Sequence, residues 1–150
     1  MRETDSITRN ALLVLLLVFY CACRKSSPIS PNEIIETTLP DPISVNMQLN
    51  EAFGGYYISL PAHYDQTTKK YPVLIFLHGA GQMGNGTTEL HYILQDGIGK
   101  LLAKKLFPPN FYSGGNNYSF IVVSPQTSRQ PLTIEVAQFI QYIKKIYRAD

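Results

Sequence analysis

The chain has 150 residues, of which 45% are hydrophobic, and its 13 basic and 11 acidic residues give a formal net charge of +2. This length is enough for one domain with a hydrophobic core. Because the charges nearly balance and form no basic stripe, nucleic acid is not expected as a partner.

Residues 1–23 have the composition of a bacterial lipoprotein signal peptide. Two arginines flank a polar start, and an apolar run follows at residues 11–20. That run is about half the ~20 residues of a membrane-spanning helix, so it fits the apolar region of a secretory signal. Ala22 before Cys23 resembles a lipobox, in which the cysteine is lipidated. We expect an exported protein, anchored by Cys23 to a bacterial membrane or the cell surface; the alternatives are an uncleaved anchor or secretion to the periplasm.

Residues 24–42 separate this signal from the rest of the chain. They are rich in proline, serine and threonine and show almost no hydrophobic periodicity. Such a composition predicts a semi-extended tether. The folded domain is therefore expected at residues 43–150, and cleavage before Cys23 would leave one cysteine and no internal disulfide.

The first part of the domain predicts three strands. Residues 43–49 and 55–60 suggest an antiparallel hairpin at the edge of a sheet, with Pro61 ending its second strand. Residues 73–78 form an apolar run without alternation, ending in His78. Such a run is typical of a strand buried on both faces of a parallel sheet.

The second part predicts helices and one more strand. The expected elements are helices at residues 88–94 and 99–106, a loop at residues 111–118, and a short buried strand at residues 119–124 that Pro125 stops. Residues 131–148 carry the clearest helical pattern, because apolar side chains recur at spacings of three and four. The order of these elements predicts an α/β domain that begins with an antiparallel edge hairpin.

A glycine-rich turn (residues 79–86, hereafter the glycine turn) follows the strand at residues 73–78. Its four glycines allow positive φ and close approach to a ligand. A His-Gly-x-Gly turn after such a strand is where serine hydrolases of the α/β type build one arm of the oxyanion hole. Backbone N–H groups of Ala80 and Gly81 fit this position, because small side chains leave the donors accessible. His78, Gly79 and Gln82 would support the turn, with His78 as a brace and not as the base.

Three segments in order resemble secreted α/β-hydrolase esterases, including the polyhydroxybutyrate-depolymerase-like, phospholipase/carboxylesterase-like and prolyl-oligopeptidase-like groups. They are residues 60–86 with His78-Gly-Ala-Gly81, residues 119–126 ending Val-Ser-Pro-Gln, and residues 140–150. The resemblance implies an exported serine hydrolase that cleaves a small-molecule or polymer carboxylic ester without a cofactor.

The sequence departs from this family in one large respect. In the family, a strand and a Gly-x-Ser-x-Gly elbow follow the last helix, and the acid and histidine of the triad come later. No Gly-x-Ser-x-Gly occurs in this sequence. We therefore expect an incomplete α/β-hydrolase sheet, the N-terminal half of the fold, in which nucleophile, acid and base are absent and which is inactive alone.

Two other classes compete with this interpretation. Residues 79–84 match G-x-G-x-x-G, which suggests a dinucleotide-binding fold, but Lys104 and Lys105 stand where that fold expects an acidic residue. A surface lipoprotein that binds glycan or a partner without catalysis is the other alternative, since its ten tyrosines would suit sugar stacking.

The remaining polar residues suggest little chemistry. His63 and His91 are candidate bases, but neither has a nearby serine in an activating context. Ser124 precedes a proline and cannot form a strand-to-helix elbow, and Ser113 is expected in a loop. The three histidines share no ligand spacing with cysteines or paired carboxylates, so no metal is predicted.

Overall fold

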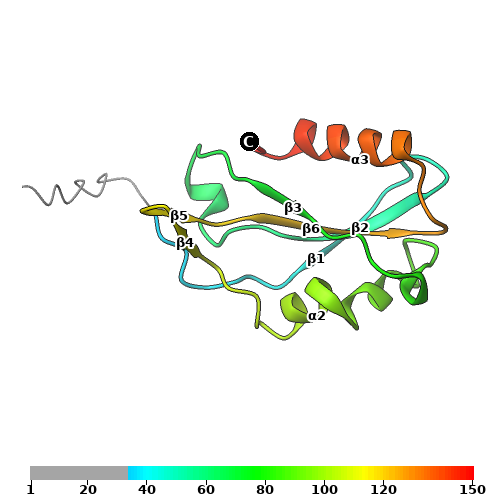
Figure 1. Ribbon diagram of the computed structural model, residues 1–150, viewed down its shortest axis with the longest axis horizontal. Coiled ribbons are helices and arrows are strands. Elements are labelled where there is room, and N and C mark those ends of the chain that lie inside the picture. Colours follow the sequence, from blue (N-terminus) through cyan, green and yellow to red (C-terminus); the bar gives the residue numbers. More distant parts are fainter. Residues whose placement is uncertain (1–33) are drawn as a thin grey trace, which may run out of the picture. The chain divides into compact units, whose positions relative to one another are not determined.

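A four-stranded mixed sheet organises residues 34–150, the part of the chain that the computed structural model describes (Figure 1). The strands, in the order β1-β2-β6-β3, are β1 (Ile43–Asn46), β2 (Phe53–Ser59), β6 (Ile121–Thr127) and β3 (Val73–Ile75). β1, β2 and β6 pair antiparallel, whereas β3 and β6 run parallel. The expected signal peptide and Cys23 lie outside the described residues.

Helices cover both faces of this sheet. α3 (Thr133–Ile146) lies on one face and α2 (Gly97–Ala103) on the other (Figure 1). The remaining elements are the 3₁₀ helices η1 (Tyr64–Gln66), η2 (Ala80–Gln82) and η3 (Leu90–Leu94) and the hairpin of β4 (Phe111–Ser113) and β5 (Asn116–Tyr118). The mixed α/β class and the antiparallel hairpin at the sheet edge are thus confirmed. Within residues 34–150, no helix is long and apolar enough to cross a membrane.

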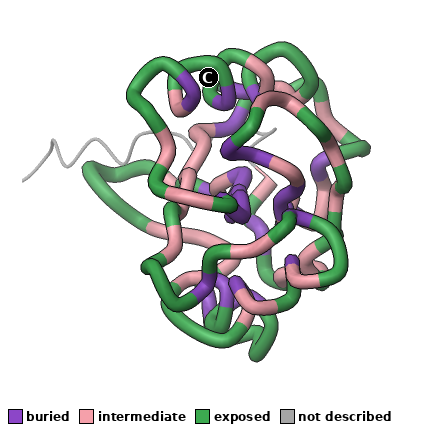
Figure 2. The backbone as a smooth tube through the Cα atoms, turned by 90° about the vertical axis from the view of Figure 1, so that its right-hand side faces the viewer, coloured by how far each residue is buried: buried purple, intermediate pink, exposed green. Residues whose placement is uncertain are grey.

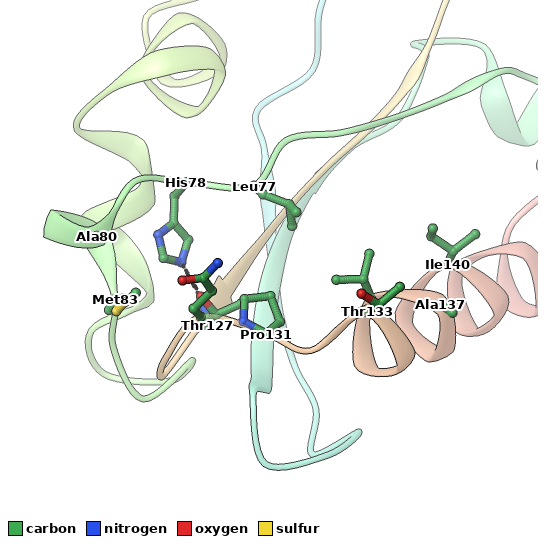
Figure 3. Close-up of a pocket in the computed structure, with 11 residues that line it drawn as sticks. Leu77, His78, Ala80, Met83, Thr127, Pro131, Thr133, Ala137 and Ile140 are labelled. Atoms are coloured by element: carbon green, nitrogen blue, oxygen red, sulfur yellow. Dashed lines mark hydrogen bonds between the residues drawn. The ribbon is translucent and has the colours of Figure 1, made fainter.

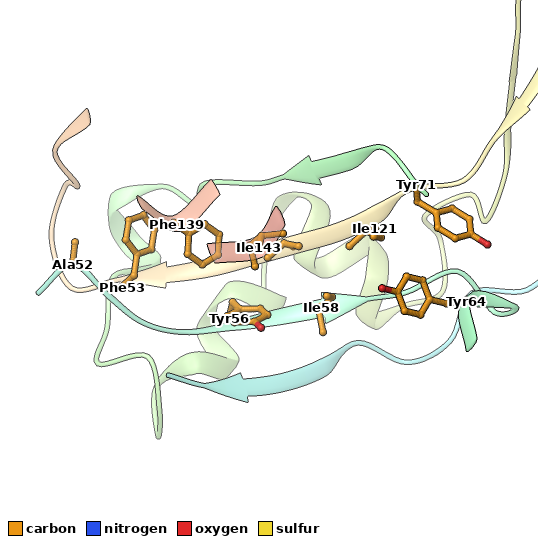
Figure 4. Close-up of a cluster of buried hydrophobic side chains, with 10 residues drawn as sticks. Ala52, Phe53, Tyr56, Ile58, Tyr64, Tyr71, Ile121, Phe139 and Ile143 are labelled. Carbon is orange, nitrogen blue, oxygen red and sulfur yellow. The ribbon is translucent and has the colours of Figure 1, made fainter. Parts of the chain in front are cut away.

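The core follows from the alternation of side chains along β6, which is buried over its whole length. Ile121 and Val123 pack with α3, while Val122 packs with α2 on the opposite face. The α3 side is built around Phe139, which stacks on Phe53 with ring centroids 4.8 Å apart (Figure 4). Figure 2 shows the backbone coloured by burial, with buried segments inside the domain and exposed turns around them.

The strand at residues 73–78 is shorter and less buried than expected. β3 ends at Ile75, its three residues are only partly buried, and Leu77 beyond it is exposed. The prediction of a strand buried on both faces is wrong because β3 lies at the edge of the sheet, with β6 on one side only. An apolar run does not reveal whether a strand has one neighbour or two.

Two further expectations about the strands are corrected. Residues 111–118, expected as a loop, form the hairpin β4–β5, whose turn holds Gly114 and Gly115 at φ values of 57° and 85°. Pro125 does not end its strand, since β6 continues to Thr127. Odd-numbered β6 residues bond toward β3: Phe76 N–H donates to Val123, and Ile121 N–H donates to Pro72. Pro125 therefore faces a side where β3 has already ended, and no ladder hydrogen bond is lost.

The predicted helices are present with shifted ends. Residues 88–94 form a 3₁₀ helix at Leu90–Leu94, α2 starts before the expected residue 99, and α3 occupies most of residues 131–148. The end of the expected tether also packs on the domain. Glu36 is buried, and its carboxylate lies 2.9 Å from Nδ1 of His63.

Candidate functional site

A cleft of about 640 Å³ lies where the carboxyl ends of β3 and β6 meet (Figure 3). Because these two strands are parallel, the segments that follow them, the glycine turn and the start of α3, lie at the same edge of the sheet. Ligands of α/β proteins commonly bind at such an edge. The lining is mostly apolar and comprises Leu77, His78, Ala80, Met83, Thr127, Gln130, Pro131, Thr133, Val136, Ala137 and Ile140.

His78 ties the glycine turn to the end of β6. Its Nε2 accepts the backbone N–H of Thr127 at 2.9 Å, so the ring proton must be on Nδ1. Nδ1 in turn donates to the carbonyl of Gly79 at 2.7 Å. Both ring nitrogens are therefore engaged in holding the backbone, and neither is free to take a proton from a substrate.

The two expected oxyanion donors begin the 3₁₀ turn η2. Gln82 N–H donates to the carbonyl of Gly79 at 3.1 Å, and Met83 N–H donates to that of Ala80 at 3.3 Å. The preceding N–H groups, those of Ala80 and Gly81, have no acceptor within residues 34–150, as is normal at the start of a helical turn. Ala80 lines the cleft, whereas Gly81 is exposed but does not line it.

Only some glycines of the turn have the role expected from the sequence. Gly86 alone has a positive φ, 71°, and a Cβ there would lie 2.3 Å from the backbone of Gly54. A Cβ at Gly84 would meet the Gln126 amide at 2.5 Å. In contrast, a Cβ at Gly79 or Gly81 would meet nothing within 4 Å, so the space beside the expected donors is open.

Gln126 of β6, which was not among the predicted site residues, holds the glycine turn in place. Its side chain is fully buried, its Nε2 donates to the carbonyls of Gln82 (3.0 Å) and Glu89 (2.8 Å), and its Oε1 accepts Gly86 N–H at 2.8 Å. Gln82 adds a donation from Nε2 to the carbonyl of Tyr92 at 3.1 Å. The sequence signal for this role was a glutamine at the end of a buried strand, because a buried side-chain amide needs several hydrogen-bond partners.

An ion pair that was also not predicted from the sequence holds the wall of the cleft opposite the glycine turn, at the start of α3. Arg129 binds the carboxylate of Glu135 through two hydrogen bonds of 2.8 and 2.9 Å, and Leu132 N–H donates to the same carboxylate at 2.8 Å. The Arg129 bonds, followed by the Leu132 bond, hold the pKa of Glu135 below its usual range. This pair fixes Gln130 and Pro131, which lie between its members and line the cleft.

The hydroxyl groups of the cleft do not form an activated nucleophile. Thr127 Oγ1 lies 3.2 Å from Nε2 of His78, a separation that suits a nucleophile and its base. However, Thr127 is only 4% exposed, and Nε2 already accepts its backbone N–H. The candidates His63 and His91 do not line the cleft: His63 faces Glu36, and His91 Nδ1 lies 3.0 Å from the carbonyl of Thr88.

The structure brings together only part of the expected site. Ala80 and His78 line the cleft, while Gly79 and Gln82 belong to the braced turn but do not line it. Ser124 is buried in β6, and Ser113 lies in β4, neither of them at the cleft. Among residues 34–150, no group of three histidine, cysteine or acidic side chains is placed to hold a metal.

Comparison with models of known protein families and with curated proteins gave no match to this sequence.

Proposed function

We propose that this chain is the N-terminal part of an exported, lipid-anchored α/β-hydrolase whose parent activity is the hydrolysis of carboxylic esters. The observation that carries the proposal is the glycine turn at the carboxyl end of parallel β3, in which the N–H groups of Ala80 and Gly81 have no acceptor within residues 34–150 and Ala80 lines an apolar cleft. The antiparallel start of the sheet followed by a parallel pair agrees with the resemblance.

The chemistry of ester hydrolysis explains why this arrangement matters. Attack on the ester carbonyl places a negative charge on its oxygen, and pre-aimed N–H donors stabilise that charge by on the order of 3 kcal/mol each. The turn is held by side-chain hydrogen bonds of His78, Gln82 and Gln126. The donors would therefore need little reorganisation when the charge develops.

The same proposal makes the chain inactive alone. An oxyanion arm lowers the barrier only when a nucleophile is positioned next to the carbonyl, and no side chain of the cleft is activated for attack. The proposed lipid anchor at Cys23 and the export signal would place the parent enzyme at a membrane or cell surface, where a polymer or small-molecule ester would be its substrate.

A first experiment tests the missing nucleophile. The full chain is assayed with p-nitrophenyl acetate, and we expect no turnover above the rate of the uncatalysed reaction. Turnover that survives repurification would contradict the assignment. The coding DNA beyond codon 150 is read in the same study: a strand followed by Gly-x-Ser-x-Gly is expected, and its absence from all three frames would refute the family proposal.

A second experiment tests the donors. Hexanoate combines an oxyanion with an apolar tail, and its titration should shift the amide signals of Ala80 and Gly81 in NMR spectra. Ala80→Pro removes one N–H at a position where proline is tolerated in a helical turn, and it should weaken the response. Ala80→Ser keeps the N–H and is the matched control; equal responses in both variants would argue against these donors.

A further inference from the structure

The exposed side of α2 combines leucines with lysines. Leu102 of this helix is buried in the core, whereas Leu101 is 39% exposed and Leu106, just beyond the helix, is 64% exposed. Exposed lysines stand next to both leucines. The residues of this surface, hereafter the α2 patch, are Lys100, Leu101, Lys104, Lys105 and Leu106.

The α2 patch carries positive charge that the described chain neutralises only in part. Lys105 pairs with Asp41 at 2.7 Å, whereas Lys100 and Lys104 have no acidic partner within residues 34–150. Asp96 precedes α2 and lies at the other end of the helix. Leucines among lysines suit the boundary between lipid headgroups and acyl chains, because leucine enters the apolar side while lysine amines reach the phosphates.

The end of the expected tether is held beside the α2 patch. Nζ of Lys105 donates to the carbonyl of Leu39 at 3.0 Å, in addition to its ion pair with Asp41. The Leu39 side chain packs against a core cluster that includes Leu102 of α2. The tether therefore joins the domain within a few residues of the patch.

The length of the chain keeps the proposed anchor close to this patch. Ten residues separate Cys23 from Ile34, so these two residues lie at most about 40 Å apart. A lipid at Cys23 would hold the patch near the bilayer at a high effective concentration, and a weak contact would suffice for docking. Arg24 and Lys25, next to Cys23, would add positive charge at the same surface.

We propose that the α2 patch docks on an anionic lipid surface, as a second membrane contact besides the lipid anchor. This inference rests on the proposed function for the anchor at Cys23, and not for the hydrolysis of esters. Each lysine near an anionic bilayer strengthens binding about fivefold, and salt weakens this attraction.

The charge of the patch argues against a second copy of this chain as its occupant. In a two-fold dimer the same patch would lie on both sides of the interface. Lys100 and Lys104 would then be placed against their own copies, and like charges would repel. The phosphates of an anionic bilayer neutralise the same lysines.

Docking through the α2 patch would orient the cleft. The cleft is lined by Ala137 and Ile140 of α3, and α3 lies on the face of the sheet opposite α2 (Figure 1). A bilayer against the α2 patch would therefore leave the cleft open to water. The proposed substrate would then be an ester that arrives from solution, and not a lipid of the same bilayer.

The test uses the full chain with isotope-labelled leucine methyl groups, bound to phosphatidylglycerol nanodiscs that contain a gadolinium-chelating lipid. Gadolinium should broaden the methyl NMR signals of Leu101 and Leu106. It should broaden those of Leu77 and Leu132 much less, although these leucines are 46% and 61% exposed, because they lie at the cleft and just before α3. Phosphatidylcholine nanodiscs, or 0.5 M salt, should remove most of this difference.

Two double variants locate the effect. Lys100→Gln with Lys104→Gln should lower the docking constant at least about tenfold. Lys144→Gln with Lys145→Gln, the same change at exposed positions of α3, is the matched control and should leave it unchanged. Glutamine is compatible with a helix at all four positions, so both variants should fold.

Three results would overturn the proposal: equal broadening of all four leucines, equal loss of docking in the two double variants, or a lipid-free chain that sediments as a dimer with Leu106 shielded. The proposed function fails separately. Broadening of Leu106 that persists in Cys23→Ser, in a protein whose mass shows no lipid, would refute the anchor and leave the docking surface standing. The absence of a downstream Gly-x-Ser-x-Gly would refute the hydrolase assignment without changing these signals.

Discussion

Replacing Gln126 by leucine should destabilise the domain through the glycine turn. The side chain is fully buried and makes three hydrogen bonds, of 2.8 to 3.0 Å, to backbone groups of Gln82, Gly86 and Glu89. Leucine has a similar volume and fills the space, so the main effect is electrostatic. Gly86 N–H becomes a buried donor without an acceptor, and two carbonyls lose a donor each.

The magnitude follows from these three groups. A buried donor left unpaired costs about 1–3 kcal/mol, and each carbonyl that loses a bond adds about 1 kcal/mol. We expect the free energy of unfolding to fall by about 3–5 kcal/mol, a large share of the ~5–15 kcal/mol typical of a domain. In urea this corresponds to a midpoint lower by roughly 1–3 M.

The assay is urea unfolding followed by far-ultraviolet circular dichroism, with Gln141→Leu as the control. Gln141 is exposed on α3, so the same chemical change there should alter the free energy by no more than about 0.5 kcal/mol. If Gln126→Leu were no more destabilising than Gln141→Leu, the buried amide would not be what holds the turn.

Two predictions concern pH. Burial, and then the 2.9 Å hydrogen bond with Tyr147, raise the pKa of Tyr56 above its usual range, so stability should be intact below about pH 10, where an unfolded tyrosine titrates, and fall above it. Tyr56→Phe should flatten this alkaline loss in urea midpoints between pH 8 and 11, and Tyr112→Phe, on an exposed residue, should not; parallel slopes would count against the assignment. The pKa of Glu135 is lowered, chiefly by the Arg129 hydrogen bonds, so its contribution is present above about pH 4.3 and lost as the pH falls further. Glu135→Gln should be less stable than the parent at pH 7 and approach it at pH 3, whereas a difference that stays constant with pH would contradict this ion pair.

Local patterns allowed much of the fold to be anticipated. The helix at residues 131–148 and the edge hairpin depend on periodicity and turn residues within one segment, and both are present. The predictions that failed concerned features that neighbouring strands determine. β3 is only partly buried because, within residues 34–150, no strand lies on its outer side, and β6 passes through Pro125 because β3 ends before reaching it. Neither fact is encoded within the segment that it affects.

The site was anticipated to a lesser degree, for a similar reason. The small residues of the glycine turn were recognisable in the sequence, and Ala80 does line the cleft. Gln126 was missed because its partner Gly86 lies 40 residues away in the sequence. Arg129 was missed although its partner Glu135 lies only six residues away. Buried polar residues are recognisable in a sequence only when their partners are known.

These contacts show which parts of the candidate site the described domain holds by itself. Every bond that braces the glycine turn comes from within the described domain, from β6, η3 and the turn itself. The outer edge of β3, in contrast, is paired within residues 34–150 only through the Tyr71–Ala149 bridge. The proposed oxyanion donors are therefore held in place by contacts within residues 34–150. If the proposed function is right, the electrostatic part of the site is thus preorganised, which is the part that contributes most when charge develops on a substrate.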